Sequence, residues 1–402
     1  MNSPITEAYV FAQSPAGNPV LAGKLAITRT SGTFAYSEQW LEESWAYALD
    51  PVNLKLTSGQ ITTRNENKVF PVFSDAAPDD WGTRVLLLGH TRSPANELER
   101  LVATSGHGVG CLQFSLSRTR PKSPTPAAGM ELLADLEEAS QKISLNQRID
   151  PKLLEILIPA TTMGGARPKV TLQDNGVHYL AKFSKPADLV NMPMVEFATL
   201  QLARLCKIDV PNVSLRRIGE RDVFLIERFD RVNNQQLHYI SIHSLFNRDR
   251  IRIFDNAFND PCSYVAIGKI LRSHARDWSA DIEQLYRRIV FNVIMGNIDD
   301  HGRNHGCLYN PANPGWRLSP AFDIVPTISQ NREHALGIGA EGRRRSMSNV
   351  KSAAVAFGLS SGQASSIIKE ISHIASEWRD HFRQAGVSPL DITLLEEVIE
   401  KI

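Results

Sequence analysis

The chain has 402 residues, of which 42% are hydrophobic and 22% are charged, as is ordinary for a folded soluble protein. Its 44 Lys and Arg residues nearly balance its 43 Asp and Glu residues. The net charge of +1 therefore gives no overall field that would favour nucleic acid or a membrane surface.

Cysteine usage and apolar runs bear on the compartment. The four cysteines are scattered without a C-x-x-C pair, which is typical of reduced thiols and not of a disulfide framework. The N-terminal residues lack a basic region followed by an apolar one, and no apolar stretch is long enough to cross a bilayer. We therefore expect a cytoplasmic protein without membrane contact.

The first part of the chain alternates apolar runs with turns. Ala8–Ala12 and Pro19–Ile27 are predicted strands, and Asp79–Leu88, with acids near its start, is a predicted helix. Ser117–Pro126 is rich in Pro, Ser and basic residues and predicts a linker. Met130–Ile143 then carries apolar residues at helical spacing.

A second strand-rich segment follows. Met163–Lys169 is a Gly-rich turn before a strand, and two apolar runs around Asn175-Gly176 predict a β-hairpin. Pro193–Cys206 is a predicted helix because Pro is tolerated in a first turn. Val223–Glu227 is a predicted strand.

From about Ser241 helical periodicity dominates, as in Ile282–Ile298 and Gly362–Phe382. We therefore expect an α+β fold with a bilobal protein-kinase-like core, an N-terminal strand-rich subdomain and a larger helical C-terminal lobe. The expected division is an N-terminal subdomain (1–116), a linker (117–129), a kinase-like N-lobe with Gly-rich loop and hinge (130–232) and a helical C-lobe (233–402).

One segment has the spacing of a kinase catalytic loop. Asp299 and Asn304 form a D-x-x-x-x-N pattern, whereas Asp300 lies one residue too close. In phosphoryl transfer one Asp orients or deprotonates the acceptor hydroxyl, and an Asn and a second Asp hold magnesium. Asp323, after a strand-like segment, is the candidate second Asp, although a lone Asp there would usually form a turn.

Three further candidates have ordinary alternatives. The Gly-rich turn could bind phosphates through backbone N–H groups or be a simple tight turn, and it lacks the Walker A spacing. Lys182 ends a strand similar to the kinase V-A-I-K, or is a solvated lysine on a strand edge. Glu196, expected in the first turn of the next helix, could pair with Lys182 or only complement the helix dipole.

His301, His305 and Cys307 offer a zinc site as an alternative, since two histidines four residues apart share a helix face. Gly302 and Gly306 favour a loop instead, and no Glu follows the first His as in an H-E-x-x-H motif. In a kinase His301 would orient the catalytic loop.

With these residues in view, the chain resembles the HipA family of bacterial serine/threonine kinase toxins. The resemblance is carried by four motifs: a D-x-H-x-x-N loop (Asp299–Asn304), a P-x-x-D segment (Pro320–Ile324), an E-R-F-D-R hinge (Glu227–Arg231) and a nucleotide loop (Gly164–Lys169). Weaker similarity at Ala22–Leu25 and Pro78–Gly82 extends it towards the N-terminus.

The resemblance implies an ATP- and magnesium-dependent protein kinase. Asp299 would be the base, with His301 orienting the loop and with Asn304 and Asp323 as magnesium ligands. The residues implied for ATP binding are Gly164, Gly165, Ala166, Lys169, Lys182, Glu227, Phe229 and Asp323, of which Glu227 and Phe229 would border the adenine.

The resemblance also implies partners and regulation. A small HipB-like helix-turn-helix antitoxin would bind operator DNA, so this chain would reach DNA only through it. The substrate would be a protein such as an aminoacyl-tRNA synthetase, whose phosphorylation inhibits translation and favours dormancy and persistence. A serine ahead of the Gly-rich turn can be autophosphorylated in this family, and Thr161 and Thr162 hold that place here.

Two alternatives remain open. One is an inert kinase core that acts as a corepressor with the antitoxin at DNA, and the other is a small-molecule phosphotransferase on a related fold. The complete set of Asp299, Asn304, Asp323 and Lys182 counts against the inert core, because each is a residue type that phosphoryl transfer requires.

Overall fold

The computed structural model describes residues 4–89, 93–104, 106–122, 125–160, 165, 167–233, 235–246 and 255–399. The chain divides into two compact units. Unit 1 comprises Met1–Pro186, Glu227–Asp249 and Leu308–Gly315, and unit 2 comprises Ala187–Ile226, Arg250–Cys307 and Trp316–Ile402. The four-part division expected from the sequence uses other boundaries and stays a prediction.

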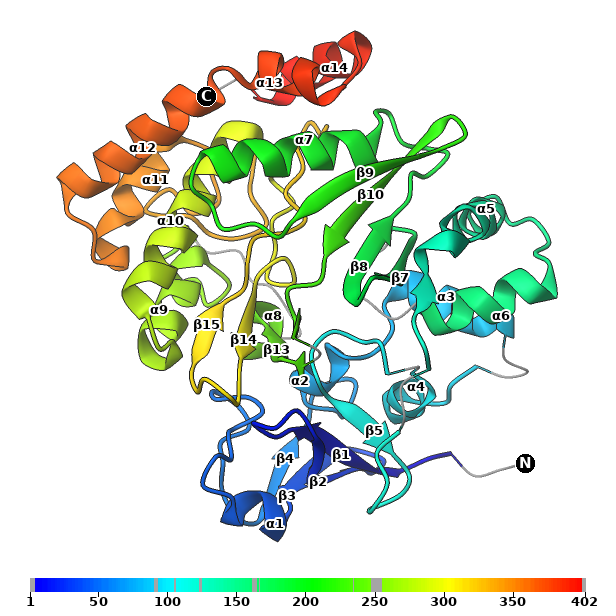
Figure 1. The fold of residues 1–402 in the computed structure, drawn as a ribbon. Coiled ribbons are helices and arrows are strands. Elements are labelled where there is room, and N and C mark those ends of the chain that lie inside the picture. Colours follow the sequence, from blue (N-terminus) through cyan, green and yellow to red (C-terminus); the bar gives the residue numbers. More distant parts are fainter. Residues whose placement is uncertain are drawn as a thin grey trace. The chain divides into compact units, whose positions relative to one another are not determined.

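Unit 1 begins with a five-stranded sheet in the order β4-β3-β2-β1-β5, with antiparallel neighbours (Figure 1). Its strands are β1 (Glu7–Gln13), β2 (Pro19–Ile27), β3 (Gly32–Tyr36), β4 (Gln60–Thr63) and β5 (Gln113–Ser115). The two strands predicted first are therefore confirmed as β1 and β2.

Between β3 and β5 the chain forms the helices α1 (Glu38–Glu42), α2 (Pro71–Ser74), α3 (Asp80–Gly89) and α4 (Glu97–Ala103). Aromatic side chains join α2 to the sheet. The ring of Phe73 on α2 lies 5.1 Å from that of Phe34 on β3 and 6.0 Å from that of Phe114 on β5, between ring centroids. All three side chains are buried, so they form the centre of this core.

The rest of unit 1 contains the predicted hairpin. Its strands β7 (Lys169–Asp174) and β8 (Val177–Lys182) pair antiparallel, with Asp174 opposite Val177. Asn175 and Gly176 have φ values of 47° and 82°, as a type I′ turn requires. The remaining elements are β6 (Ala128–Gly129), a 3₁₀ turn (Met130–Leu132), α5 (Leu133–Ser144), α6 (Pro151–Ala160), β11 (Arg231–Val232), β12 (Gln235–Gln236), β13 (His238–Ser241) and α8 (Ile242–Phe246).

Unit 2 is mainly helical (Figure 1). Its helices are α7 (Met192–Leu205), α9 (Tyr264–His274), α10 (Trp278–Met295), α11 (Met347–Ala353), α12 (Ser361–Ala375), α13 (Trp378–Ala385) and α14 (Pro389–Ile399), with a 3₁₀ turn at Ala354–Phe357. Its strands are β9 (Val213–Ile218), β10 (Arg221–Glu227, whose last residue belongs to unit 1) and β15 (Trp316–Leu318); β14 (Gly306–Tyr309) crosses the division.

Helix α10 lies at the centre of unit 2 and leads to the candidate catalytic loop. Its N-cap Asp277 accepts a hydrogen bond from the Ala280 amide at 3.4 Å, and Gly296, with φ 71°, is its C-cap. Tyr286 and the helix's other buried side chains pack in the unit's core, and the Tyr286 ring lies 5.6 Å from that of Phe357 between centroids.

Two helix predictions need correction. The helix expected over Ile282–Ile298 begins earlier, at Trp278, because Asp277 caps it, and it ends before Gly296. The segment Gly362–Phe382, which the apolar periodicity predicts as helical throughout, is two helices, α12 and α13, because the chain leaves the helix at Ser376–Glu377.

The mixed fold with a strand-rich N-terminal region and a helical C-terminal part is as predicted. Among the described residues, no helix combines the length and hydropathy that a membrane crossing needs. All four cysteines are buried thiols. Burial raises the pKa of Cys111 to about 11 and the pKa values of Cys206 and Cys307 to about 12.

Candidate active site

The candidate catalytic loop follows α10 directly and belongs entirely to unit 2. Asn297 is buried and donates from Nδ2 to the Asn292 Oδ1 on α10 at 3.1 Å. The Asn304 amide N–H donates to the His301 carbonyl at 2.9 Å, and Asn304 Nδ2 donates to the Asp299 carbonyl at 3.5 Å. The loop therefore has its own hydrogen bonds, and the contact between Asn304 and Asp299 is the longer of these two.

The two adjacent carboxylates of this loop lie in opposite environments. Asp299 is exposed, whereas Asp300 is 2% exposed. An exposed carboxylate can reach a hydroxyl on a substrate, and a buried one cannot. The spacing argument assigns the chemistry to Asp299, and this role stays a prediction.

Asp300 has a structural role that the spacing does not indicate. Its Oδ2 accepts hydrogen bonds from the Tyr264 hydroxyl, from Asn292 Nδ2 at 2.8 Å and from His305 Nε2 at 2.7 Å. Burial alone raises the pKa of Asp300, but His305 and the hydrogen bonds outweigh it, so the pKa is lowered. A buried carboxylate therefore connects the loop to α9 and α10.

These bonds also bear on the zinc alternative. His305 is 2% exposed, and its Nε2 is used by Asp300. Cys307 is buried, and burial raises the pKa of its thiol. The described part of the chain contains no group of three or more His, Cys, Asp or Glu that could hold a metal ion. A zinc site at His301, His305 and Cys307 is therefore not supported.

Asp323 has an unusual backbone. Its φ is 56°, a conformation that costs most non-glycine residues about 1–2 kcal/mol, although Asp adopts it more readily than most. The strand before it is held from α10: the Leu318 amide donates to Asp281 Oδ2 at 3.0 Å, and Arg288 Nη2 donates to the Ser319 carbonyl at 2.6 Å. Strained residues that are supported in this way are often found at functional sites.

Unit 1 carries the predicted lysines. Lys182 ends β8, lies opposite Lys169 in the hairpin and is 8% exposed, which argues against a solvated lysine on a strand edge. Lys169 is 4% exposed, and its Nζ lies 3.3 Å from Asp79 Oδ2. Burial is the main reason that the pKa of Asp79 is raised, although Lys169 acts in the other direction. Lys169 therefore has an anionic partner within the protein.

Glu196 lies elsewhere than the sequence suggested. Helix α7 begins at Met192 with Asn191 as its N-cap, so its first turn contains no acid and Glu196 lies in the second turn. At 4% exposed it is also buried. Both facts weaken the alternative that Glu196 only complements the helix dipole.

The nucleotide-loop prediction is only partly covered. Thr161, Thr162, Gly164 and Ala166 lie outside the described residues. Gly165 has a φ of 122°, and a Cβ on it would collide with the Lys169 ammonium group. The lysine end is flexible and can shift, so it is the backbone conformation that favours glycine here.

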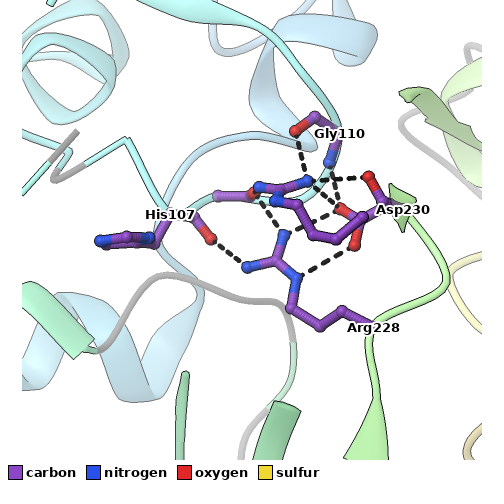
Figure 2. Close-up of polar contacts among 6 residues, drawn as sticks. His107, Gly110, Arg228 and Asp230 are labelled. Carbon is purple, nitrogen blue, oxygen red and sulfur yellow. Dashed lines mark hydrogen bonds and ion pairs between the residues drawn. The ribbon is translucent and has the colours of Figure 1, made fainter. Parts of the chain in front are cut away.

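The predicted hinge residues Glu227 and Phe229 are half-buried at the end of β10, and the Phe229 ring lies 6.4 Å from that of Tyr239 between centroids. The charged residues between and after them were not predicted to have a role. Figure 2 shows Arg228 and Asp230 beside the turn that contains His107 and Gly110. The signals in the sequence are the E-R-F-D-R motif itself and the alternation of opposite charges in it.

Comparison with known proteins gives both family and fold matches. Residues 161–378 match the model of the HipA-like C-terminal domain, and residues 17–115 match that of the HipA N-terminal domain. The chain is 23% identical over 325 residues to the putative kinase Y4mE of Sinorhizobium fredii, covering 74% of this chain and 72% of that protein. It is also 23% identical over 337 residues to the serine/threonine-protein kinase toxin HipA of Shewanella oneidensis, covering 76% of this chain and 73% of the toxin.

Among solved structures, a chain from the complex of Shewanella oneidensis HipA, HipB and its operator DNA is similar, with a TM-score of 0.71 and 18% identity. The match covers 97% of this chain and 95% of that one. At this identity the likeness establishes the fold.

Proposed function

Since this chain belongs to the HipA family of kinase toxins, we propose that it is an ATP- and magnesium-dependent serine/threonine protein kinase and the toxin of a HipBA-like toxin–antitoxin pair. The observation that carries the proposal is the contrast within the loop, where Asp299 is exposed and Asp300 is buried. This contrast leaves one carboxylate, at the position of a kinase base, able to meet a substrate.

In this proposal Asp299 accepts the proton of the acceptor hydroxyl. The hydroxyl oxygen then bonds to the γ-phosphorus of ATP as the bond to the β-phosphate oxygen breaks, and ADP leaves. Lys182 is the proposed partner of the nucleotide phosphates, and Glu227 and Phe229 are the proposed adenine contacts. His301 is proposed to orient the loop.

Magnesium would neutralise charge on the phosphates, and Asn304 and Asp323 are the proposed ligands. Their oxygens are the hard donors that magnesium prefers. Because Asn304 Nδ2 donates to the Asp299 carbonyl, the amide oxygen is the atom that a cation would take. The residues present therefore fit this ion.

Partner and substrate are further parts of the proposal. The similar solved structure contains HipB and operator DNA, which supports a helix-turn-helix antitoxin for this chain and DNA contact only through it. A net charge of +1 is in keeping with indirect DNA contact. Family resemblance supports a translation component, such as an aminoacyl-tRNA synthetase, as substrate and autophosphorylation at Thr161 or Thr162.

Two measurements test the proposal. ATP with magnesium should raise the melting temperature, because a ligand that binds only the folded state stabilises it. Asp299→Asn should keep this shift but transfer labelled phosphate about 10²- to 10⁴-fold more slowly and lose toxicity. An absent shift in the wild type would favour the corepressor scaffold, and wild-type transfer by Asp299→Asn would refute the mechanism.

A further inference from the structure

Three charged side chains after β10 form a buried cluster, here called the Arg228 cluster (Arg228, Asp230 and Arg231). The side chains of Arg228 and Asp230 are 1% and 2% exposed, and that of Arg231 is 7% exposed. Arg228 binds Asp230 through two bonds, Nε to Oδ1 at 3.0 Å and Nη2 to Oδ2 at 2.8 Å. Arg231 Nη1 adds a third bond, to Oδ2, at 2.8 Å.

The cluster also binds the backbone of a distant turn, His107–Gly110 (Figure 2). Arg228 donates to the His107 carbonyl at 2.8 Å and to the Gly108 carbonyl at 2.9 Å. Arg231 donates to the carbonyls of Gly108 at 3.0 Å and Gly110 at 2.9 Å. In return the Gly110 amide donates to Asp230 Oδ2 at 2.7 Å.

These contacts hold the turn specifically. The turn's carbonyls accept four charge-assisted bonds, and its Gly110 amide donates one, so a shift of the turn would break several at once. Gly110 also packs closely against Tyr239, because a Cβ on Gly110 would lie 3.0 Å from the Tyr239 amide nitrogen. The turn and the segment after β10 therefore form one rigid contact within unit 1.

The charge balance shows why Asp230 matters most. Two guanidinium groups share one buried carboxylate, and the backbone carbonyls complete their hydrogen bonding. Burial by itself raises the pKa of Asp230, but Arg228 and Arg231 lower it far more, so Asp230 is ionised at neutral pH. Without this carboxylate two buried cations would face each other.

The position of the cluster in the chain suggests what it does. Arg228 lies between Glu227 and Phe229, the proposed adenine contacts. The hydrogen bonds of Arg228 therefore restrain the backbone of Glu227 and of Phe229. The Arg228 amide also donates to the His178 carbonyl on β8 at 2.8 Å, and the Leu237 amide donates to the Asp230 carbonyl at 3.0 Å. The hinge segment is therefore fixed on both sides.

We propose that the Arg228 cluster is a positioning site that couples the His107–Gly110 turn of the N-terminal region to the hinge, and so sets the affinity for ATP. This inference rests on the proposed kinase function. In this proposal Arg228, Asp230 and Arg231 act through Glu227 and Phe229 and not by contact with the nucleotide.

The test compares two isosteric changes of buried carboxylates in unit 1. Asp230→Asn removes the charge of the cluster. The control is Glu99→Gln. Glu99 is 6% exposed, and its carboxylate accepts hydrogen bonds from the Ile5 amide at 3.1 Å and the Ala95 amide at 2.7 Å. Both variants should melt at lower temperature. Only Asp230→Asn should raise the KM for ATP, by about 3- to 30-fold, with kcat changed less.

Arg231→Lys is a milder second variant, because it keeps the charge but cannot reach Gly108, Gly110 and Asp230 together. Hydrogen exchange of the wild type gives an independent measurement. By reciprocity, ATP should slow exchange at the Gly110 amide, which is not a proposed nucleotide contact.

The outcomes separate the two proposals. A wild type that binds no ATP overturns the kinase function and this inference with it. A wild type that binds ATP overturns only this inference if Arg231→Lys keeps the wild-type KM, or if ATP leaves exchange at Gly110 unchanged. A raised KM in Arg231→Lys together with slower Gly110 exchange supports it.

Discussion

Replacing Asp300 by Asn should destabilise unit 2 without removing the proposed base, Asp299. The change keeps the shape of the side chain and removes its charge. Asp300 is 2% exposed and accepts three hydrogen bonds, from Tyr264, Asn292 and His305. All three hydrogen bonds reach the same carboxylate oxygen, Oδ2. In Asp300→Asn the amide oxygen can replace it, but only as a neutral acceptor.

The size of the effect follows from those bonds. A hydrogen bond to a charged group contributes about 1.5–3 kcal/mol and a neutral one about 0.5–1.5 kcal/mol, so each bond loses about 1 kcal/mol. Three coupled bonds give a loss of about 2–4 kcal/mol in the free energy of unfolding. For a compact unit of about 150–250 residues this lowers Tm by roughly 5–15 °C.

Thermal unfolding followed by circular dichroism measures this, with Asp299→Asn as the control. Asp299 is exposed, so its substitution should change the free energy of unfolding by no more than about 0.5 kcal/mol. Phosphate transfer should show the reverse order, with the larger loss in Asp299→Asn. The reasoning is refuted if Asp300→Asn has the same Tm as the wild type, or if Asp299→Asn loses as much stability as Asp300→Asn.

Three other predictions follow from the site and the core. Asp323→Asn should fold, because Asn also tolerates a φ of 56°, but its magnesium-dependent ATP binding should weaken by at least about tenfold in titration calorimetry. The pKa values of His238 and His334 are lowered to about 4 by burial, so the unfolded chain binds their protons first as pH falls. Stability should be full above about pH 6.5 and fall towards pH 4 by about 1.4 kcal/mol per histidine per pH unit, and a flat Tm across this range would contradict it. Mass spectrometry of active protein should find phosphate on Thr161 or Thr162, and phosphate only elsewhere would refute that site.

Local signals in the sequence predicted local structure well. The Asn175-Gly176 pair places a hairpin turn because it acts over two residues, and Pro193 places the start of α7 to within one residue. The sequence does not reveal the break between α12 and α13, because the apolar spacing continues across Ser376. The break is visible only in the backbone, where α12 ends at Ala375 and α13 begins at Trp378.

Candidate site residues were predictable where they lie in one short segment. The spacing of Asp299 and Asn304 pointed to the carboxylate that is exposed in the structure, and its role as base stays a prediction. The role of Asp300 was not predictable, because Tyr264 lies 36 residues away in the chain. The Arg228 cluster was further out of reach, since its partner turn lies about 120 residues away. Contacts of that span depend on the whole fold.

Because all four cysteines are buried, their reaction with a thiol reagent can be used to measure unfolding. Cys111 belongs to unit 1, whereas Cys206, Cys262 and Cys307 belong to unit 2, and none is accessible to a thiol reagent in the folded state. Alkylation during a denaturant or ATP series, followed by peptide mapping, would therefore read the opening of each unit separately in the unmodified protein. A single cysteine introduced at an exposed position such as Leu390 would be labelled selectively against this silent background.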